Sequence, residues 1–172
     1  MQARSSPPVR TVPPKNSVRK PAAAVPASLL LDNQLCFALY SASLAMTKRY
    51  RLALATIGIT YPQYVVMLAL WQRDGVTVSE LGQRVALDSG TLTPLLKRLQ
   101  ALQLVKRTRS SADEREVHIT LTAKGHALRT KAGAVHEQIA CATGCTQGER
   151  QQLTLSLQRL KGALLSSAAP TP

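Results

Sequence analysis

Acidic side chains are scarce in this chain of 172 residues. Nine aspartates and glutamates stand against 22 lysines and arginines, which gives a formal net charge of +13 at pH 7. An excess of this size indicates a polyanionic partner, most simply nucleic acid, with an anionic membrane surface as the weaker alternative. Long apolar runs are also missing, so we expect no segment that spans a bilayer. The length suffices for one domain with its own core.

Cysteine is rare as well, with three residues in the chain. An odd number at low density, without a secretory pattern, favours reduced thiols in the cytoplasm. The chain has no C-x-x-C pair and no glycine-rich cofactor loop, which argues against a redox enzyme, and we expect no cofactor. Cys141 and Cys145 lie near His136 in the sequence. Gly144 and the helix break TGCT prevent the two cysteines from forming a rigid pair of metal ligands, and no fourth ligand is evident. We therefore expect no metal site.

The first 28 residues contain six prolines and no acidic side chain. Their basic residues are Arg4, Arg10, Lys15, Arg19 and Lys20. Such a segment cannot bury enough apolar surface to offset its ordering entropy, so we predict a disordered tail over residues 1–28. This tail either adds non-specific affinity for DNA or is an inert extension. We expect the folded domain at residues 29–168 and a short tail at 169–172.

Apolar or small side chains recur at helical spacing where the folded domain begins. They are Leu35, Leu39, Ala42, Met46, Tyr50, Ala53 and Ile57. Their steps of three and four predict one helix over 29–57, roughly 37 Å long, that ends at Gly58. A small domain cannot bury so long an apolar face, which predicts a partner subunit. Helices over 122–166, opened by Thr122 and by a capping box of Thr146 and Glu149, complete the expected dimerisation region.

The segment ITYPQYVVMLALWQRDG has a start signal at Thr60 and a stop signal at Gly75. We predict a helix here, although the apolar run alone would also fit a buried strand. A capping box at Thr77 opens the next helix, and Ser89 is expected to cap the one after it, whose leucines line one side. Pro94 is expected close enough to the start of that helix for its missing amide hydrogen to cost little.

Beyond residue 104 the apolar period changes from helical to two. VKRTR and EVHITL alternate, and SSADER between them is a turn, so we predict a β-hairpin with a charged tip. Two helices joined by a tight turn and followed by a basic hairpin form a winged helix-turn-helix. The expected fold class is therefore mainly α with a small β-hairpin wing. The DNA-binding lobe lies at about residues 60–122, and the flanking helices form a homodimer.

The second helix of this motif leaves polar side chains opposite its leucines. Hydroxyls and a lysine there can contact phosphates and base edges in a major groove, and a glycine lets the backbone come close. The candidate residues are Ser89, Gly90, Thr91, Thr93 and Lys97. An ordinary helix pair with a solvated basic hairpin explains each feature singly. The ordered combination, in so basic a chain, favours DNA binding.

The predicted wing adds a second set of candidate DNA contacts. Arg107 and Arg109 lie on its first strand, and Arg115 at its tip can enter a minor groove, where the negative potential is enhanced over A·T tracts. Asp113 can brace Arg115 by an ion pair. The expected partner is therefore double-stranded operator DNA, A·T-rich and pseudo-palindromic to match a two-fold protein.

The motifs themselves resemble a known family. LDSGTLTPLLKRLQ, followed by LVKRTR and DER, resembles the recognition helix and wing of the MarR family. NQLCFALY and ITYPQY resemble one branch of it, the organic-hydroperoxide-sensing repressors. The resemblance extends from residue 31 to about 165, and the basic tail has no counterpart. It implies a homodimeric repressor that leaves DNA when an organic hydroperoxide, its inducer, oxidises Cys36.

Cys36 and Tyr40 are four residues apart and therefore neighbours on one helical face. A phenol beside a thiol can stabilise the thiolate or hold a peroxide oxygen. Tyr50 follows 14 residues after Cys36, roughly 21 Å along a straight helix, so it cannot reach the cysteine of its own chain. The resemblance implies that Tyr50 and Tyr61 meet the cysteine of the partner subunit. It also implies a two-cysteine type, in which Cys141 matches the resolving cysteine.

Other interpretations of these residues stay open. On the residues alone, Cys36 is more ordinarily a small buried hydrophobe, and Tyr64 is predicted to pack in the core or at an interface. Cys145 is expected to be incidental. Two other functions remain as alternatives: a MarR-like regulator controlled by a small phenolic ligand, with an inert Cys36, and, with less support, a thiol peroxidase.

Overall fold

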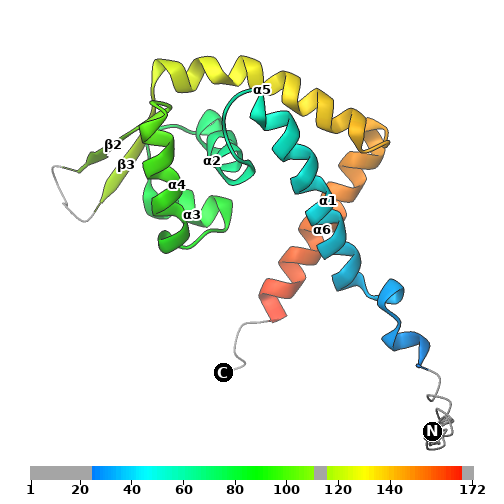
Figure 1. Ribbon diagram of the computed structural model, residues 1–172. Coiled ribbons are helices and arrows are strands. Elements are labelled where there is room, and N and C mark those ends of the chain that lie inside the picture. The colour runs from blue at the N-terminus through cyan, green and yellow to red at the C-terminus, as the bar shows by residue number, and fades with distance from the viewer. Residues whose placement is uncertain (1–24, 111–115, 168–172) are drawn as a thin grey trace, which may run out of the picture. The chain divides into compact units, whose positions relative to one another are not determined.

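The computed structural model describes residues 25–110 and 116–167, and these fall into two compact units divided after Leu39. The helices are α1 (Leu35–Ala55), α2 (Tyr61–Gln72), α3 (Val78–Val85), α4 (Ser89–Ala101), α5 (Ala123–Ala142) and α6 (Gln147–Ser167). The strands are β1 (Val76–Thr77), β2 (Val105–Arg109) and β3 (Val117–Leu121). The predicted fold class, mainly α with a small β wing, is confirmed (Figure 1).

In the described part of the first unit, two short 3-10 helices, Ala27–Leu29 and Leu31–Asn33, precede the α-helix, which starts only at Leu35. The prediction of a continuous helix from residue 29 is therefore wrong at its start. The side-chain amide of Asn33 donates to the Ala27 carbonyl at 2.8 Å, and that of Gln34 donates to the Ser28 carbonyl at 2.6 Å. Such side-chain bonds to nearby backbone stabilise tight turns in place of helix.

The predicted DNA-binding lobe, at about residues 60–122, has a core of leucines and other aliphatic side chains. Leu92, Leu96 and Leu99 of α4 are fully buried, as the leucine stripe predicted, and they share the cluster with Met67 and Ile119. Leu102, the residue directly after α4, is 38% exposed. The segment at 61–72 is a helix, as predicted, and not a strand.

The β-hairpin has the predicted antiparallel pairing, with Val105 opposite Leu121 and Arg109 opposite Val117. A third strand, β1, was not predicted. It has two residues and pairs with the other edge of β3, Val76 opposite Ile119, so that the sheet order is β1-β3-β2. The wing is thereby joined to the start of α3.

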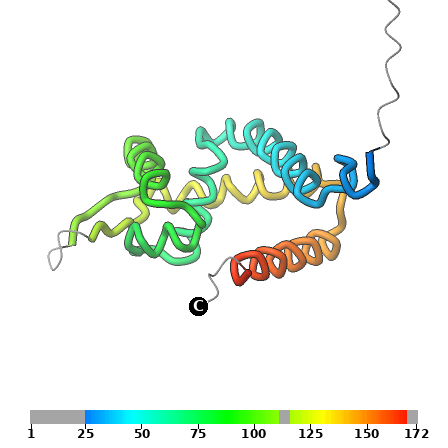
Figure 2. Tube along the Cα trace, turned by 90° about the horizontal axis from the view of Figure 1, so that it is seen from below, coloured from blue at the N-terminus to red at the C-terminus, as the bar shows by residue number. Residues whose placement is uncertain are grey.

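Capping side chains fix where most helices begin. At α3 the Thr77 amide donates to the Glu80 carboxylate at 2.8 Å and the Glu80 amide donates to the Thr77 hydroxyl at 3.2 Å, as predicted. The same box forms at α6 between Thr146 and Glu149. Thr122 caps α5 by accepting from the Gly125 amide at 3.0 Å. After the TGCT break α6 turns back relative to α5 (Figure 2).

The tails were predicted at residues 1–28 and 169–172. Residues 1–24 and 168–172 lie outside the described residues, so those predictions stay predictions. Within the described part of the chain, no helix has the length and apolar character to cross a membrane.

Candidate functional site

The amino end of α4 is organised by Asp88, not by Ser89 as predicted. The Asp88 carboxylate accepts from the Thr91 amide and from the Thr91 hydroxyl, both at 2.8 Å. These two hydrogen bonds hold the pKa of Asp88 below its usual range. Ser89 is the first residue of the helix, so Pro94 is the sixth. An amide hydrogen there would bond to the Gly90 carbonyl, so the proline does cost one helical hydrogen bond, contrary to expectation.

The candidate DNA-reading residues of α4 lie at this end. Ser89, Gly90, Thr91 and Lys97 are exposed, and Thr93 is half-buried. A Cβ atom at Gly90 would lie 3.0 Å from the Asp88 carboxylate, so the glycine leaves room for the cap. The Thr91 hydroxyl is engaged with that carboxylate. The exposed surface of α4 therefore presents a hydroxyl, bare backbone and a lysine, groups that suit phosphates and base edges.

The wing places basic side chains beside α4. Lys106 and Arg109 are exposed on β2, whereas Arg107 is half-buried and pairs across the sheet with fully buried Ile119. Over residues 25–110 and 116–167, the Arg107 Nε is the one buried side-chain nitrogen or oxygen that lacks a hydrogen-bond partner. This burial has no signature in the sequence, because arginine at an alternating position is usually solvated.

Two predicted wing residues, Asp113 and Arg115, fall outside the described residues. The hairpin is described as far as the Ser110 amide, which donates to the Glu116 carbonyl at 2.9 Å. The roles of Asp113 and Arg115 therefore stay predictions.

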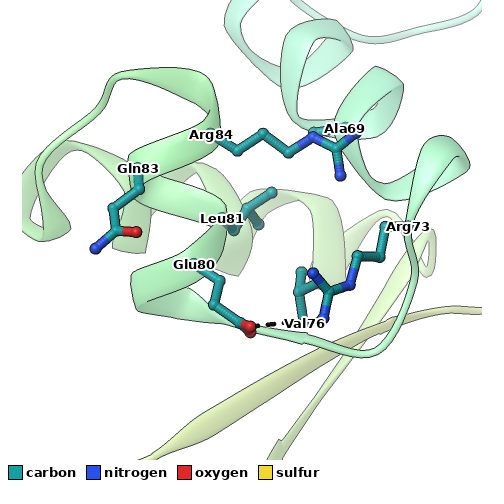
Figure 3. A pocket seen from close by; sticks show the side chains of 7 residues that line it. All are labelled: Ala69, Arg73, Val76, Glu80, Leu81, Gln83 and Arg84. Carbon is teal, nitrogen blue, oxygen red and sulfur yellow. Dashed lines mark ion pairs between the residues drawn. The ribbon is translucent and has the colours of Figure 1, made fainter.

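Side chains that line a polar groove connect α3 to α2 (Figure 3). Arg73 forms an ion pair with Glu80 at 3.8 Å, and Arg84 reaches back to α2, where its guanidinium donates to the Gln72 side chain. Buried Leu81 forms part of the apolar floor. These contacts position α3, the helix on which α4 packs.

Tyr50 and Tyr61, two of the three tyrosines predicted to support the thiol, cluster with Tyr64 where α1 ends and α2 begins. The ring centroids of Tyr50 and Tyr61 are 4.6 Å apart, and those of Tyr50 and Tyr64 are 5.6 Å apart. Tyr64 is 2% exposed, which confirms its prediction as a core residue. Burial, and then the neighbouring phenols of Tyr64 and Tyr61, raise the pKa of Tyr50 to about 12. The Tyr50 phenol therefore keeps its proton, and its capacity to donate a hydrogen bond, to a higher pH than an ordinary tyrosine does.

All three cysteines are unpaired. Cys36 is exposed in the single chain, so it is not part of that chain's core, and Tyr40 is 62% exposed. Cys141 is exposed in the last turn of α5. Cys145 is half-buried, and its thiol donates to the Thr143 carbonyl at 3.5 Å. Within residues 25–110 and 116–167, no three histidine, cysteine or acidic side chains gather as metal ligands.

Large apolar side chains remain uncovered on α6 and along α1. None of the residues of α6 is buried, and its exposed leucines are Leu153, Leu155, Leu157, Leu164 and Leu165. On α1, only Ala53 and Leu54 are buried, and the exposed apolar residues include Leu35, Leu44, Met46 and Leu52. Each helix thus carries an apolar face without a cover in the single chain.

Comparison with known proteins decides the family. The family model for the transcriptional regulator SarA/Rot matches residues 48–131. The HTH-type transcriptional regulator TtmR of Methylorubrum extorquens (strain PA1) is 47% identical, over 82% of this chain and 72% of that protein. The organic hydroperoxide resistance transcriptional regulator of Bacillus subtilis (strain 168) is 45% identical, over 78% of this chain and 86% of that protein. The chain belongs to the SarA/Rot family of MarR-like winged-helix transcriptional regulators.

Solved structures agree with this MarR-like assignment. AbfR of Staphylococcus epidermidis is 36% identical and superposes with a TM-score of 0.65, covering 79% of this chain and 94% of that one. AbfR has also been solved reduced and bound to DNA, and in a disulfide form, with TM-scores of 0.64 and 0.57 to this chain. The MarR resemblance of the sequence is thereby confirmed, including the likeness to an organic hydroperoxide regulator.

Asp88 was not predicted from the sequence as a functional residue. It caps α4, the helix that carries the candidate DNA-contacting residues of this MarR-like regulator. Asp and Ser are equally good N-caps, and they are adjacent here. The local signal could therefore name a pair of candidates but not choose between them.

Proposed function

We propose that this regulator is a redox-sensing repressor that binds operator DNA as a reduced homodimer and leaves it when an organic hydroperoxide oxidises Cys36. The observation that carries the proposal is the exposed thiol of Cys36 in a chain 45% identical to a regulator named for organic hydroperoxide resistance. The unpaired cysteines suit a reducing cytoplasm.

The proposed homodimer uses the uncovered faces of α1 and α6. A second copy of the chain covers these faces, because a two-fold axis brings the same apolar surface of each subunit into contact. The two DNA-binding lobes then meet half-sites about one helical turn apart on an A·T-rich pseudo-palindrome.

In the proposed DNA complex, α4 lies in the major groove. Ser89, Gly90, Thr91, Thr93 and Lys97 form its contact surface, with Thr91 held by the cap and Thr93 half-buried. The wing follows the backbone with Arg107 and Arg109. Arg115, braced by Asp113, enters the minor groove at the flank. The excess of basic over acidic side chains in the chain supports this neutralisation of phosphates.

The proposed chemistry takes place at Cys36. Its thiolate attacks the terminal oxygen of the hydroperoxide, the O–O bond breaks, and the alkoxide leaves as an alcohol after taking a proton. The product is a cysteine sulfenic acid, a reversible oxidation state. Tyr40 of the same helix and the partner's Tyr50 and the partner's Tyr61 supply O–H donors to the peroxide. The protonated state of the Tyr50 phenol supports this role.

The sulfenic acid then condenses with a second thiol, forming a disulfide and releasing water. Cys141 is the proposed resolving residue, and its exposure supports that role. Because Cys36 belongs to the first helix and Cys141 to a late one, the proposed bond joins two subunits. A disulfide needs the two α carbons within roughly 7 Å, so its formation fixes the relative placement of the helices that carry them.

Two titrations separate this proposal from its alternatives. A DNA-shift assay of reduced protein with an organic hydroperoxide should show release, whereas a regulator controlled by a small phenolic ligand would keep its DNA. Sustained peroxide consumption with a thiol donor, over many turnovers, would instead indicate a thiol peroxidase.

Non-reducing gels test the resolving thiol. Oxidised wild type should run as a cross-linked dimer, and Cys141→Ser should not. Cys145→Ser is the matched control on the neighbouring thiol and should cross-link like wild type. A cross-link that survives Cys141→Ser would reject Cys141.

A further inference from the structure

Four of the six aromatic side chains form one continuous line of ring contacts, which we call the aromatic path. The ring centroids of Tyr61 and Tyr50 are 4.6 Å apart, and those of Tyr50 and Tyr64 are 5.6 Å apart. The Tyr64 ring then meets the Trp71 ring edge-on, with centroids 6.3 Å apart. Separations of this size are direct contact between rings. Over residues 25–110 and 116–167, every contact between aromatic rings belongs to this path.

The aromatic path is partly exposed at both ends and buried in the middle. Tyr61 and Tyr50 are half-buried where α1 ends and α2 begins, and Trp71 is half-buried near the end of α2. Tyr64, between them, is 2% exposed. A reactive molecule in solution can therefore meet either end of the path, but it cannot meet Tyr64.

The residue types along the path are those that give up one electron to a strong oxidant. Tyrosine and tryptophan do so, whereas phenylalanine does not. A phenylalanine at position 64 would fill the same space in the core without the cost of burying a hydroxyl. A tyrosine at this buried position therefore favours a chemical role in addition to packing.

The phenols of the path hold their protons firmly. Burial raises the pKa of Tyr64, and burial together with the neighbouring phenols raises the pKa of Tyr50 to about 12. An electron that leaves either phenol is therefore accompanied by its proton. At the far end of the path, the Trp71 indole N–H donates to the Gly125 carbonyl at 2.9 Å, which holds the ring beside Tyr64.

We propose that the aromatic path carries one-electron oxidation from Tyr61 and Tyr50 to Trp71 and thereby quenches alkoxyl radicals. Such a radical forms when ferrous iron gives one electron to an organic hydroperoxide, with ferric iron and hydroxide as the other products. The activity is separate from the two-electron oxidation of Cys36 and does not require that thiol.

Each step moves one electron and one proton. The alkoxyl radical takes a hydrogen atom from the phenol of Tyr61 or Tyr50, becomes an alcohol and leaves a tyrosyl radical. A radical on Tyr61 passes to Tyr50, and Tyr50 is restored by an electron and a proton from Tyr64. Tyr64 is restored in turn by an electron from the Trp71 ring and the proton of its indole N–H.

The oxidation ends on Trp71, at the partly exposed end of the path. There a thiol in solution returns a hydrogen atom to the indolyl radical, which restores the tryptophan and leaves a thiyl radical in solution. Without a reductant, dioxygen adds to the indolyl radical, and the oxidised indole records that the radical reached Trp71.

The yield of oxidised Trp71 tests the path. Cys36→Ser protein, in which the sensing thiol cannot compete, would be treated with ferrous iron and cumene hydroperoxide in air. Peptide mass spectrometry would then quantify oxygen added to Trp71. In this background Tyr64→Phe keeps the ring and interrupts the path, so oxidation of Trp71 should fall several-fold. Coupling of Tyr50 with Tyr61 to dityrosine should rise, because the oxidation stops there.

Two features make this comparison specific. Tyr64 is buried, so its replacement removes no phenol that meets the radical directly. Oxidation of Met46, which is 38% exposed and lies outside the path, measures the oxidant dose in the same digest and should be equal in both proteins. Equal oxidation of Trp71 in Tyr64→Phe and its parent, at equal oxidation of Met46, would overturn the proposal and indicate direct attack on the indole.

Tyr50→Phe covers the case in which Tyr64→Phe does not fold. Tyr61 touches the rest of the path only through the Tyr50 ring, so this variant should also lower the oxidation of Trp71. Unchanged oxidation of Trp71 would again overturn the path. Because every protein in the test lacks Cys36, failure of a hydroperoxide to release DNA from wild type would overturn the proposed function and leave this result intact.

Discussion

At the scale of single residues, the phenol of Tyr50 shows how packing sets a chemical state. Its pKa is raised to about 12 from an ordinary value of 10.0, so the folded protein holds this proton more tightly than the unfolded chain does. The associated stability is complete below about pH 10 and is lost as the pH rises through about 12. Melting temperatures across this range should therefore fall less for Tyr50→Phe than for wild type. Parallel curves for the two proteins would contradict this account of Tyr50.

The basic wing gives a second prediction at this scale. Arg115→Ala should weaken operator binding by about tenfold, and most on A·T-rich flanks, where a minor-groove arginine gains most. Arg150→Ala is the control with equal loss of charge, since Arg150 donates to the Cys145 carbonyl at the start of α6, far along the chain from the wing. Both variants would be titrated by fluorescence anisotropy at one salt concentration. Equal affinity of Arg115→Ala and wild type would remove Arg115 from the interface.

At the scale of secondary-structure elements, the start of α4 is the sharpest point to test. Asp88→Ala should lower the melting temperature and the affinity for operator DNA, because it removes two hydrogen bonds that fix the first turn. Ser89→Ala keeps those bonds and should melt like wild type. Thermal unfolding followed by circular dichroism distinguishes the two variants. A larger drop in melting temperature for Ser89→Ala than for Asp88→Ala would identify Ser89 as the N-cap.

A helix could be predicted from the sequence wherever a capping residue is followed by apolar side chains at helical spacing. Thr77 with Glu80, Thr122, and Thr146 with Glu149 all cap as predicted, since capping is decided within four residues. The two-residue β1 was missed because it exists only by pairing with β3, some 40 positions away. The start of α1 was placed too early because the predicted helix was begun at residue 29, although its helical spacing starts at Leu35. Asn33 and Gln34 stabilise turns instead.

At the scale of the whole molecule, the uncovered apolar faces of α1 and α6 predict an obligate dimer. Analytical ultracentrifugation at micromolar concentration should show a dimer without detectable monomer. Leu157→Glu should shift the equilibrium towards monomer, because it places a charge on the uncovered face of α6. A wild-type monomer that persists at these concentrations would contradict the proposed dimerisation region.

The proposed thiol site was accessible to sequence reasoning only in part. The helical spacing of Cys36 and Tyr40 is a local property, and the pairing of Tyr50 with Tyr61 brings together residues on successive helices. The proposed contacts of Cys36 with a second subunit involve surfaces that are exposed in the single chain, so no local sequence pattern predicts them. The hydrogen bond from the Trp71 indole to the Gly125 carbonyl could not be predicted either, because it has no signature at either position.

Operator release by hydroperoxide is the most direct test of the central claim. Fluorescence anisotropy of labelled operator would be followed as an organic hydroperoxide is added to reduced wild type and to Cys36→Ser. Wild type should lose its DNA as the hydroperoxide approaches one equivalent per subunit, and thiol reductant should restore binding. Cys36→Ser should bind the operator as tightly as reduced wild type does, and it should keep the operator throughout the titration. Release of Cys36→Ser from DNA at the same hydroperoxide concentration as wild type would contradict the account.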